Sequence, residues 1–89
     1  MDALTVTASD RIRSINKEVN ILSARIAEHD KALAEIDAMS RDVSTEEEAR
    51  RLQSARGRTL RHRRKLLEER KRLLTGKKEL KGQLQGGES

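Results

Sequence analysis

The chain has 89 residues, of which 39% are charged and 34% are hydrophobic, and it contains no Phe, Tyr, Trp, Cys or Pro. Any core must therefore be aliphatic, and disulfides and thiolate metal sites are excluded. The longest uninterrupted apolar run is only Ala32-Leu33-Ala34, so no segment is expected to span a membrane. The acidic opening MDALTVTASD does not resemble a secretory signal, and a cytoplasmic location is predicted.

A first helix is predicted over residues 8–39, because apolar residues recur there at alternating spacings of three and four. Such spacing is typical of the core positions of a coiled coil. His29 interrupts the pattern, and residues 1–7 lack it, so these seven are expected to be a flexible N-terminus. The core residues predicted from this helix are Ile12, Ile15, Val19, Leu22, Ile26, Leu33 and Ile36.

A turn is predicted over residues 40–44, where the apolar pattern stops. Ser44 and Thr45 each precede a glutamate by three residues, Glu47 and Glu48 respectively. This spacing is the capping box that starts many helices. One continuous helix is the alternative, because neither proline nor glycine interrupts the segment.

A second helix is predicted over residues 45–84, followed by a disordered tail over residues 85–89. Leucines recur at seven-residue intervals on this helix, and a column of basic residues recurs at the same interval: Arg56, Arg63, Arg70 and Lys77. The core residues predicted from this helix are Leu52, Leu60, Leu66, Leu67, Leu73, Leu74 and Leu80.

The predicted fold class is all-α, an antiparallel helical hairpin resembling a coiled coil. A compact turn would pair residues whose numbers sum to about 85. That register places Arg70 beside Ile15 and Glu18, and Arg56 beside His29 and Asp30. The basic column then has three interpretations: it pairs with acids of the first helix, it holds cations ready for a ligand, or it fixes the register.

Self-association is also predicted. The apolar face of the second helix is wider than one neighbouring helix requires, and a two-helix hairpin buries little area. A homo-oligomer is therefore expected, most simply a dimer that forms a four-helix bundle.

The charge distribution provides the main functional indication. Residues 46–89 contain fourteen bases and seven acids, which favours an acidic partner. The predicted function is a small protein–protein interaction module, such as an assembly, adaptor or inhibitory factor of the kind also found in phages. The residues expected to contact an acidic protein surface are Arg58, Arg61, Arg64, Lys65, Lys71, Arg72 and Lys78.

The alternative is an accessory nucleic-acid-binding protein in which the same cations contact phosphates without sequence specificity. No aromatic residue is present to stack on bases, which counts against this alternative. No nucleophile, phosphate-binding loop or metal-binding spacing occurs, so the chain is not expected to be an enzyme or to bind a cofactor or metal.

Overall fold

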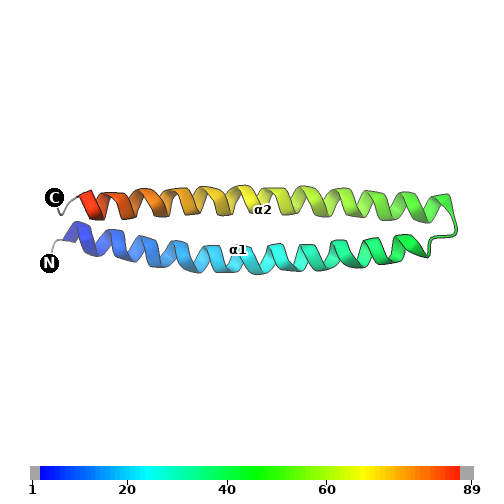
Figure 1. Cartoon of the computed structure of the whole chain (residues 1–89), viewed down its shortest axis with the longest axis horizontal. Helices are drawn as coiled ribbons and strands as arrows, with labels where there is room; N and C mark the ends of the chain where they lie inside the picture. The colour runs from blue at the N-terminus through cyan, green and yellow to red at the C-terminus, as the bar shows by residue number, and fades with distance from the viewer. Residues whose placement is uncertain (1–2, 87–89) are drawn as a thin grey trace.

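The protein is a hairpin of two long helices. The computed structural model describes residues 3–86, and the side chains of residues 7–84. Helix α1 covers Ala3–Arg41 and helix α2 covers Glu46–Gly86. The helices run antiparallel, so the start of α1 lies beside the end of α2 (Figure 1). The result is a rod of 66 × 15 × 14 Å, and the predicted all-α class is confirmed.

Both helices extend beyond their predicted limits. Residues 3–7, predicted to be flexible, belong to α1. The β-branched residues Thr5, Val6 and Thr7 disfavour a helix by only a few tenths of a kcal/mol each, which is too little to stop one. Residues 85 and 86 of the predicted tail belong to α2, while residues 87–89 lie outside the described residues. Within residues 3–86, no helix is long and apolar enough to cross a membrane.

The connection between the helices is extended rather than compact. It covers residues 42–45, and α2 begins farther along the rod than α1 ends (Figure 1). Thr45 caps α2, because its Oγ1 accepts a hydrogen bond of 3.2 Å from the amide of Glu48. This bond confirms the predicted capping by Thr45. Three glutamates, Glu46 to Glu48, follow in the first turn, where the helix dipole favours negative charge.

The extended connection changes the register of the hairpin. Arg56 contacts Asp37, Arg63 contacts Asp30, and Arg70 contacts Ser23, so the numbers of each pair sum to 93. The predicted sum of about 85 was wrong by about one heptad. An extended residue advances about 3.3 Å along its axis and a helical residue about 1.5 Å, so the connection displaces α2 by several helical positions.

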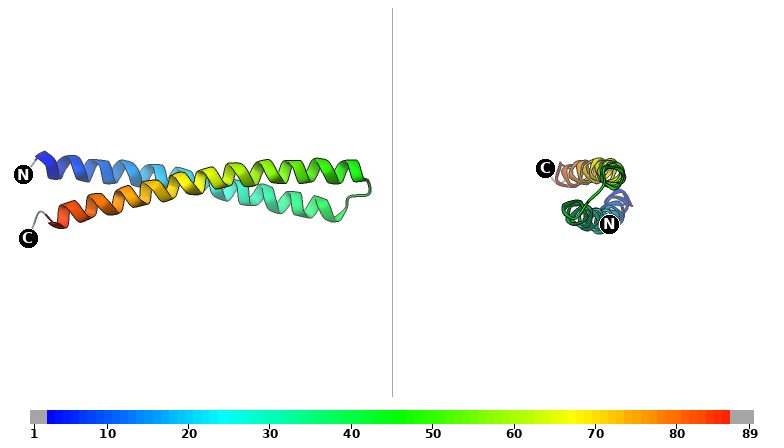
Figure 2. Two further views of the ribbon diagram at one scale, coloured as in Figure 1. Left: turned by 90° about the horizontal axis from the view of Figure 1, so that it is seen from above. Right: turned by 90° about the vertical axis from the view of Figure 1, so that its right-hand side faces the viewer.

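The core is thin and is supplied mainly by α1. Among the described side chains, only Leu22, Ile26 and Ile36 are buried apolar residues. The two helices cross when viewed from above, so each wraps around the other (Figure 2). The other predicted core residues are half-buried, except Leu60 and Leu74, which are exposed. The half-buried set is Ile12, Ile15, Val19, Leu33, Leu52, Leu66, Leu67, Leu73 and Leu80.

The glycines inside α2 have no packing role in the hairpin. A Cβ atom added at Gly57 or Gly76 would meet no neighbouring atom within 4 Å. Glycine destabilises a helix interior by about 1 kcal/mol relative to alanine. Gly57→Ala and Gly76→Ala should each raise the free energy of unfolding by about that amount, measured by urea denaturation. A lower free energy of unfolding after either substitution would show that the hairpin requires the absence of a side chain at that glycine.

Candidate protein-interaction surface

Three arginines of α2 contact polar residues of α1 at a constant interval, two through hydrogen bonds and Arg56 through an ion pair. The Nε atom of Arg63 lies 2.6 Å from Oδ1 of Asp30, and Nε of Arg56 lies 3.3 Å from Oδ1 of Asp37. Nη1 of Arg70 donates a bond of 3.1 Å to Oγ of Ser23. We call Arg56, Arg63 and Arg70 the arginine ladder.

The ladder has a structural role in the hairpin. Its acidic partners are Asp37 and Asp30, whereas the predicted register had placed Glu18 beside Arg70. Exposed ion pairs of this kind stabilise a protein by about 0–1 kcal/mol each, because water screens the charges and the side chains lose entropy. The ladder therefore contributes more to the choice of register than to overall stability.

A column of leucines on α2 lies next to the ladder and is only partly covered. Leu60 is 37% exposed and Leu74 is 44% exposed, while Leu67 between them is half-buried. Each leucine follows a ladder arginine by four residues, so it neighbours that arginine on the helix surface. We call Leu60, Leu67 and Leu74 the leucine stripe.

A second column of cations borders the other side of the stripe. Arg64, Lys71 and Lys78 each follow a leucine of the stripe by four residues, and all three are exposed. We call them the flanking column. A shallow hollow in this part of α2 is lined by residues of all three columns and by Thr75: Leu67, Arg70, Lys71, Leu74, Thr75 and Lys78. The Thr75 hydroxyl donates a 2.9 Å bond to the Lys71 carbonyl, which satisfies it within the helix.

The four remaining cations predicted to contact a partner lie on a different face of α2. They are exposed, and their helical positions turn them away from the leucine stripe. Acidic residues border them, since Glu68 and Glu79 line a hollow together with Arg72 and with Lys71 of the flanking column. We call these residues the outward cations: Arg58, Arg61, Lys65 and Arg72. The seven predicted residues thus divide into two sets, and only the flanking column lies beside exposed apolar side chains.

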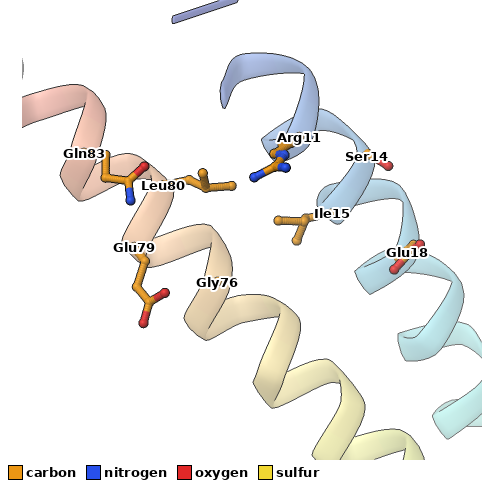
Figure 3. A pocket seen from close by; sticks show the side chains of 8 residues that line it. All are labelled: Arg11, Ser14, Ile15, Glu18, Gly76, Glu79, Leu80 and Gln83. Carbon is orange, nitrogen blue, oxygen red and sulfur yellow. The ribbon is translucent and has the colours of Figure 1, made fainter. Parts of the chain in front are cut away.

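The hollow at the opposite edge of the hairpin has mixed chemistry. It lies between the helices where Gly76 contributes no side chain, and Arg11, Ile15 and Leu80 point toward one another there (Figure 3). Glu18, Glu79 and Gln83 also line it, so its polar groups combine one cation with two carboxylates. This composition does not select a particular ligand.

The two histidines meet across the hairpin. The rings of His29 and His62 lie 6.2 Å apart between centroids in an edge-to-face arrangement. Nδ1 of His29 is 2.7 Å from the Arg25 carbonyl oxygen. The predicted neighbour of His29 was different, namely Arg56. Within the described part of the chain, no three His, Cys, Asp or Glu residues are grouped so as to hold a metal ion.

The fold and this surface define the protein as a two-helix antiparallel hairpin with a partly covered leucine stripe on its basic helix. Compared with protein-family models, with curated proteins and with solved structures, the chain matches none of them.

Proposed function

We propose that this protein is a non-catalytic protein–protein interaction module, an assembly, adaptor or inhibitory factor, whose α2 binds an acidic partner. The observation that carries the proposal is the unneutralised charge of α2. Residues 56–81 contain twelve bases and three acids. Among the described residues, salt bridges from this segment to α1 involve only Arg56 and Arg63. The flanking column and the outward cations remain available to a partner.

A surface of this charge favours acidic partners through both rate and specificity. Complementary charge accelerates the diffusional encounter of two proteins and excludes partners of like charge. Both effects weaken as salt screens the field over about 10 Å at 0.1 M ionic strength. An acidic partner should therefore bind the protein more weakly as salt concentration rises.

Fluorescence anisotropy with three labelled probes tests the proposal: a glutamate-rich helical peptide, duplex DNA and single-stranded RNA. The peptide should bind near physiological salt, and the nucleic acids only at low salt. Failure of the peptide to bind at any salt concentration would overturn the proposal.

Accessory nucleic-acid binding is the second candidate function. The flanking column supports it, because three exposed cations at seven-residue spacing provide regular contacts for phosphates. The acids among the outward cations count against a continuous phosphate-binding face. Nucleic-acid affinity tighter than about 10⁻⁶ M near physiological salt, falling steeply as salt rises, would favour this function over the first.

The proposal extends to self-association into a dimeric four-helix bundle at high ionic strength. The exposed Leu60 and Leu74 and the small core support association, because thin helical proteins gain stability by covering apolar surface. The cations around the stripe oppose it at low salt, since two copies would bring like charges together.

Sedimentation equilibrium checks this salt dependence. We expect a monomer at about 0.05 M salt and a dimer at about 1 M, where the Debye length falls to about 3 Å. A dimer that weakens as salt rises would contradict the repulsion on which the expectation rests.

A further inference from the structure

We infer that the leucine stripe, with the arginine ladder on one side and the flanking column on the other, is a docking site for one amphipathic helix. The docked helix would carry a leucine-rich seam bordered by acidic residues. This inference rests on the proposed function and narrows it to a defined part of α2 and a defined partner chemistry.

The spacing of the stripe selects a helix as its occupant. Leu60, Leu67 and Leu74 recur every seven residues and span about 21 Å along α2. A seven-residue apolar repeat fits the seam of another helix, whereas a strand presents side chains to one face at every second residue. Helix α1 packs against the other side of the ladder and does not cover the exposed area of the stripe.

The charges around the stripe select acidic flanks on that helix. Arg64, Lys71 and Lys78 border one side, and all three are exposed. On the other side, Arg70 donates its hydrogen bond to the neutral hydroxyl of Ser23, so this contact does not offset its positive charge. The hollow that contains Leu67 and Leu74 is lined by three cations and by no acid. Glutamates on both sides of a leucine seam would meet cations on both sides of the stripe.

A second copy of the chain fits this site less well in either orientation. If the stripe packed against α2 of another copy, each flanking column would face another flanking column. If it packed against α1, the leucines would meet the ladder side of that helix, which carries Ser23, Asp30 and Asp37. An anionic lipid surface is also a poorer match, because the stripe is one residue wide and has no aromatic residue.

The experiment uses three synthetic peptides of about three heptads, labelled with fluorescein. The first has a leucine seam flanked by glutamates, the second has serine in place of the leucines, and the third has glutamine in place of the glutamates. Binding to the full-length protein is measured by fluorescence anisotropy. Only the first peptide should bind well, and because the protein is unchanged, this comparison does not depend on the folding of any variant.

Four variants then locate the site on the protein. Leu60→Ser with Leu74→Ser should weaken binding of the first peptide by about tenfold for each leucine. Its control is Ile21→Ser, which removes a side chain that is 54% exposed on α1. Arg64→Glu with Lys71→Glu should weaken binding by about tenfold at low salt. Its control is Arg61→Glu with Lys65→Glu, the same change in charge among the outward cations. Ile21→Ser should change the affinity by less than about twofold, and reversal of Arg61 and Lys65 should weaken binding clearly less than reversal of Arg64 and Lys71, because it acts only through the long-range field.

The outcomes separate this inference from the function on which it rests. Equal binding of the leucine and serine peptides, with equal effects of the two charge reversals, would overturn the docking site and leave a general acidic-protein function standing. Failure of every acidic peptide would overturn both. Stripe-dependent binding to phosphatidylglycerol vesicles without binding of the first peptide would assign the site to lipid and overturn the inference. Dimerisation through the stripe that the first peptide fails to reverse would also overturn it.

Discussion

Replacing Ile26 with alanine should lower the free energy of unfolding by about 3 kcal/mol. Ile26 is 5% exposed and is one of three buried apolar side chains among the described residues. Its truncation removes contacts and leaves a cavity that two long, rigid helices cannot easily close. Because native domains are stable by only about 5–15 kcal/mol and this core is thin, the variant should lose much of its helicity near body temperature. Urea denaturation followed by circular dichroism measures the change.

The matched control is Ile21→Ala, the same substitution five residues earlier in α1. Ile21 is 54% exposed, so its removal should change the free energy of unfolding by less than about 0.5 kcal/mol. Similar losses for Ile21→Ala and Ile26→Ala would mean that the hairpin does not pack as described.

Reversing the acidic side of the arginine ladder should have the second-largest effect on stability. Asp30→Lys with Asp37→Lys removes two ion pairs and places lysines beside Arg63 and Arg56. Each exposed pair contributes up to about 1 kcal/mol, so the loss and the new repulsion together should lower stability by about 2 kcal/mol at low salt. The effect should shrink in about 1 M salt, because the charges are then screened.

Exchanging the charges of the two helices, so that opposite charges again face each other, provides the decisive control. Arg56→Glu with Arg63→Glu in the same chain should recover most of the lost stability. Glu28→Lys with Glu35→Lys produces the same change in net charge on an exposed face of α1 and should have a smaller effect. If the reversed ladder failed to recover stability, the contacts of Arg56 and Arg63 with Asp37 and Asp30 would not be pairing interactions in solution.

The architecture was largely predictable, because the spacing of apolar residues and the capping residues of a helix are local signals in the sequence. Alternating three- and four-residue spacing identified α1, and the hydroxyl of Thr45 identified the start of α2. Register was not predictable from the same signals. Sliding one helix by seven residues returns every apolar residue to the seam, so hydrophobicity alone cannot choose between such registers.

Charge distinguishes the two registers. The predicted alignment would place Arg56 beside Asp30 and leave Arg63 beside Leu22, which carries no charge. The observed alignment pairs both arginines with aspartates. Ser23, Asp30 and Asp37 recur at the same interval as the ladder, and this shared interval was a signal in the sequence that could have fixed the alignment.

The candidate site was predicted only in part. Helical periodicity placed the seven cations of α2 on an outward face and along one edge, but periodicity alone does not show which leucines beside them stay exposed. Leu60 and Leu74 were assigned to the core because they share the heptad spacing of Leu66 and Leu73. Their exposure depends on which side of α2 faces α1, and the ladder contacts determine that orientation.

The edge-to-face contact of His29 and His62 provides a spectroscopic marker of register. These imidazoles are the only aromatic rings in the chain, and each helix contributes one. Each ring should therefore shift the proton resonances of the other in an NMR spectrum that contains no other ring signals. Sliding the helices by one heptad would separate the rings by about 10 Å and remove these mutual shifts. The two histidines thus report the alignment of the whole rod without any added label.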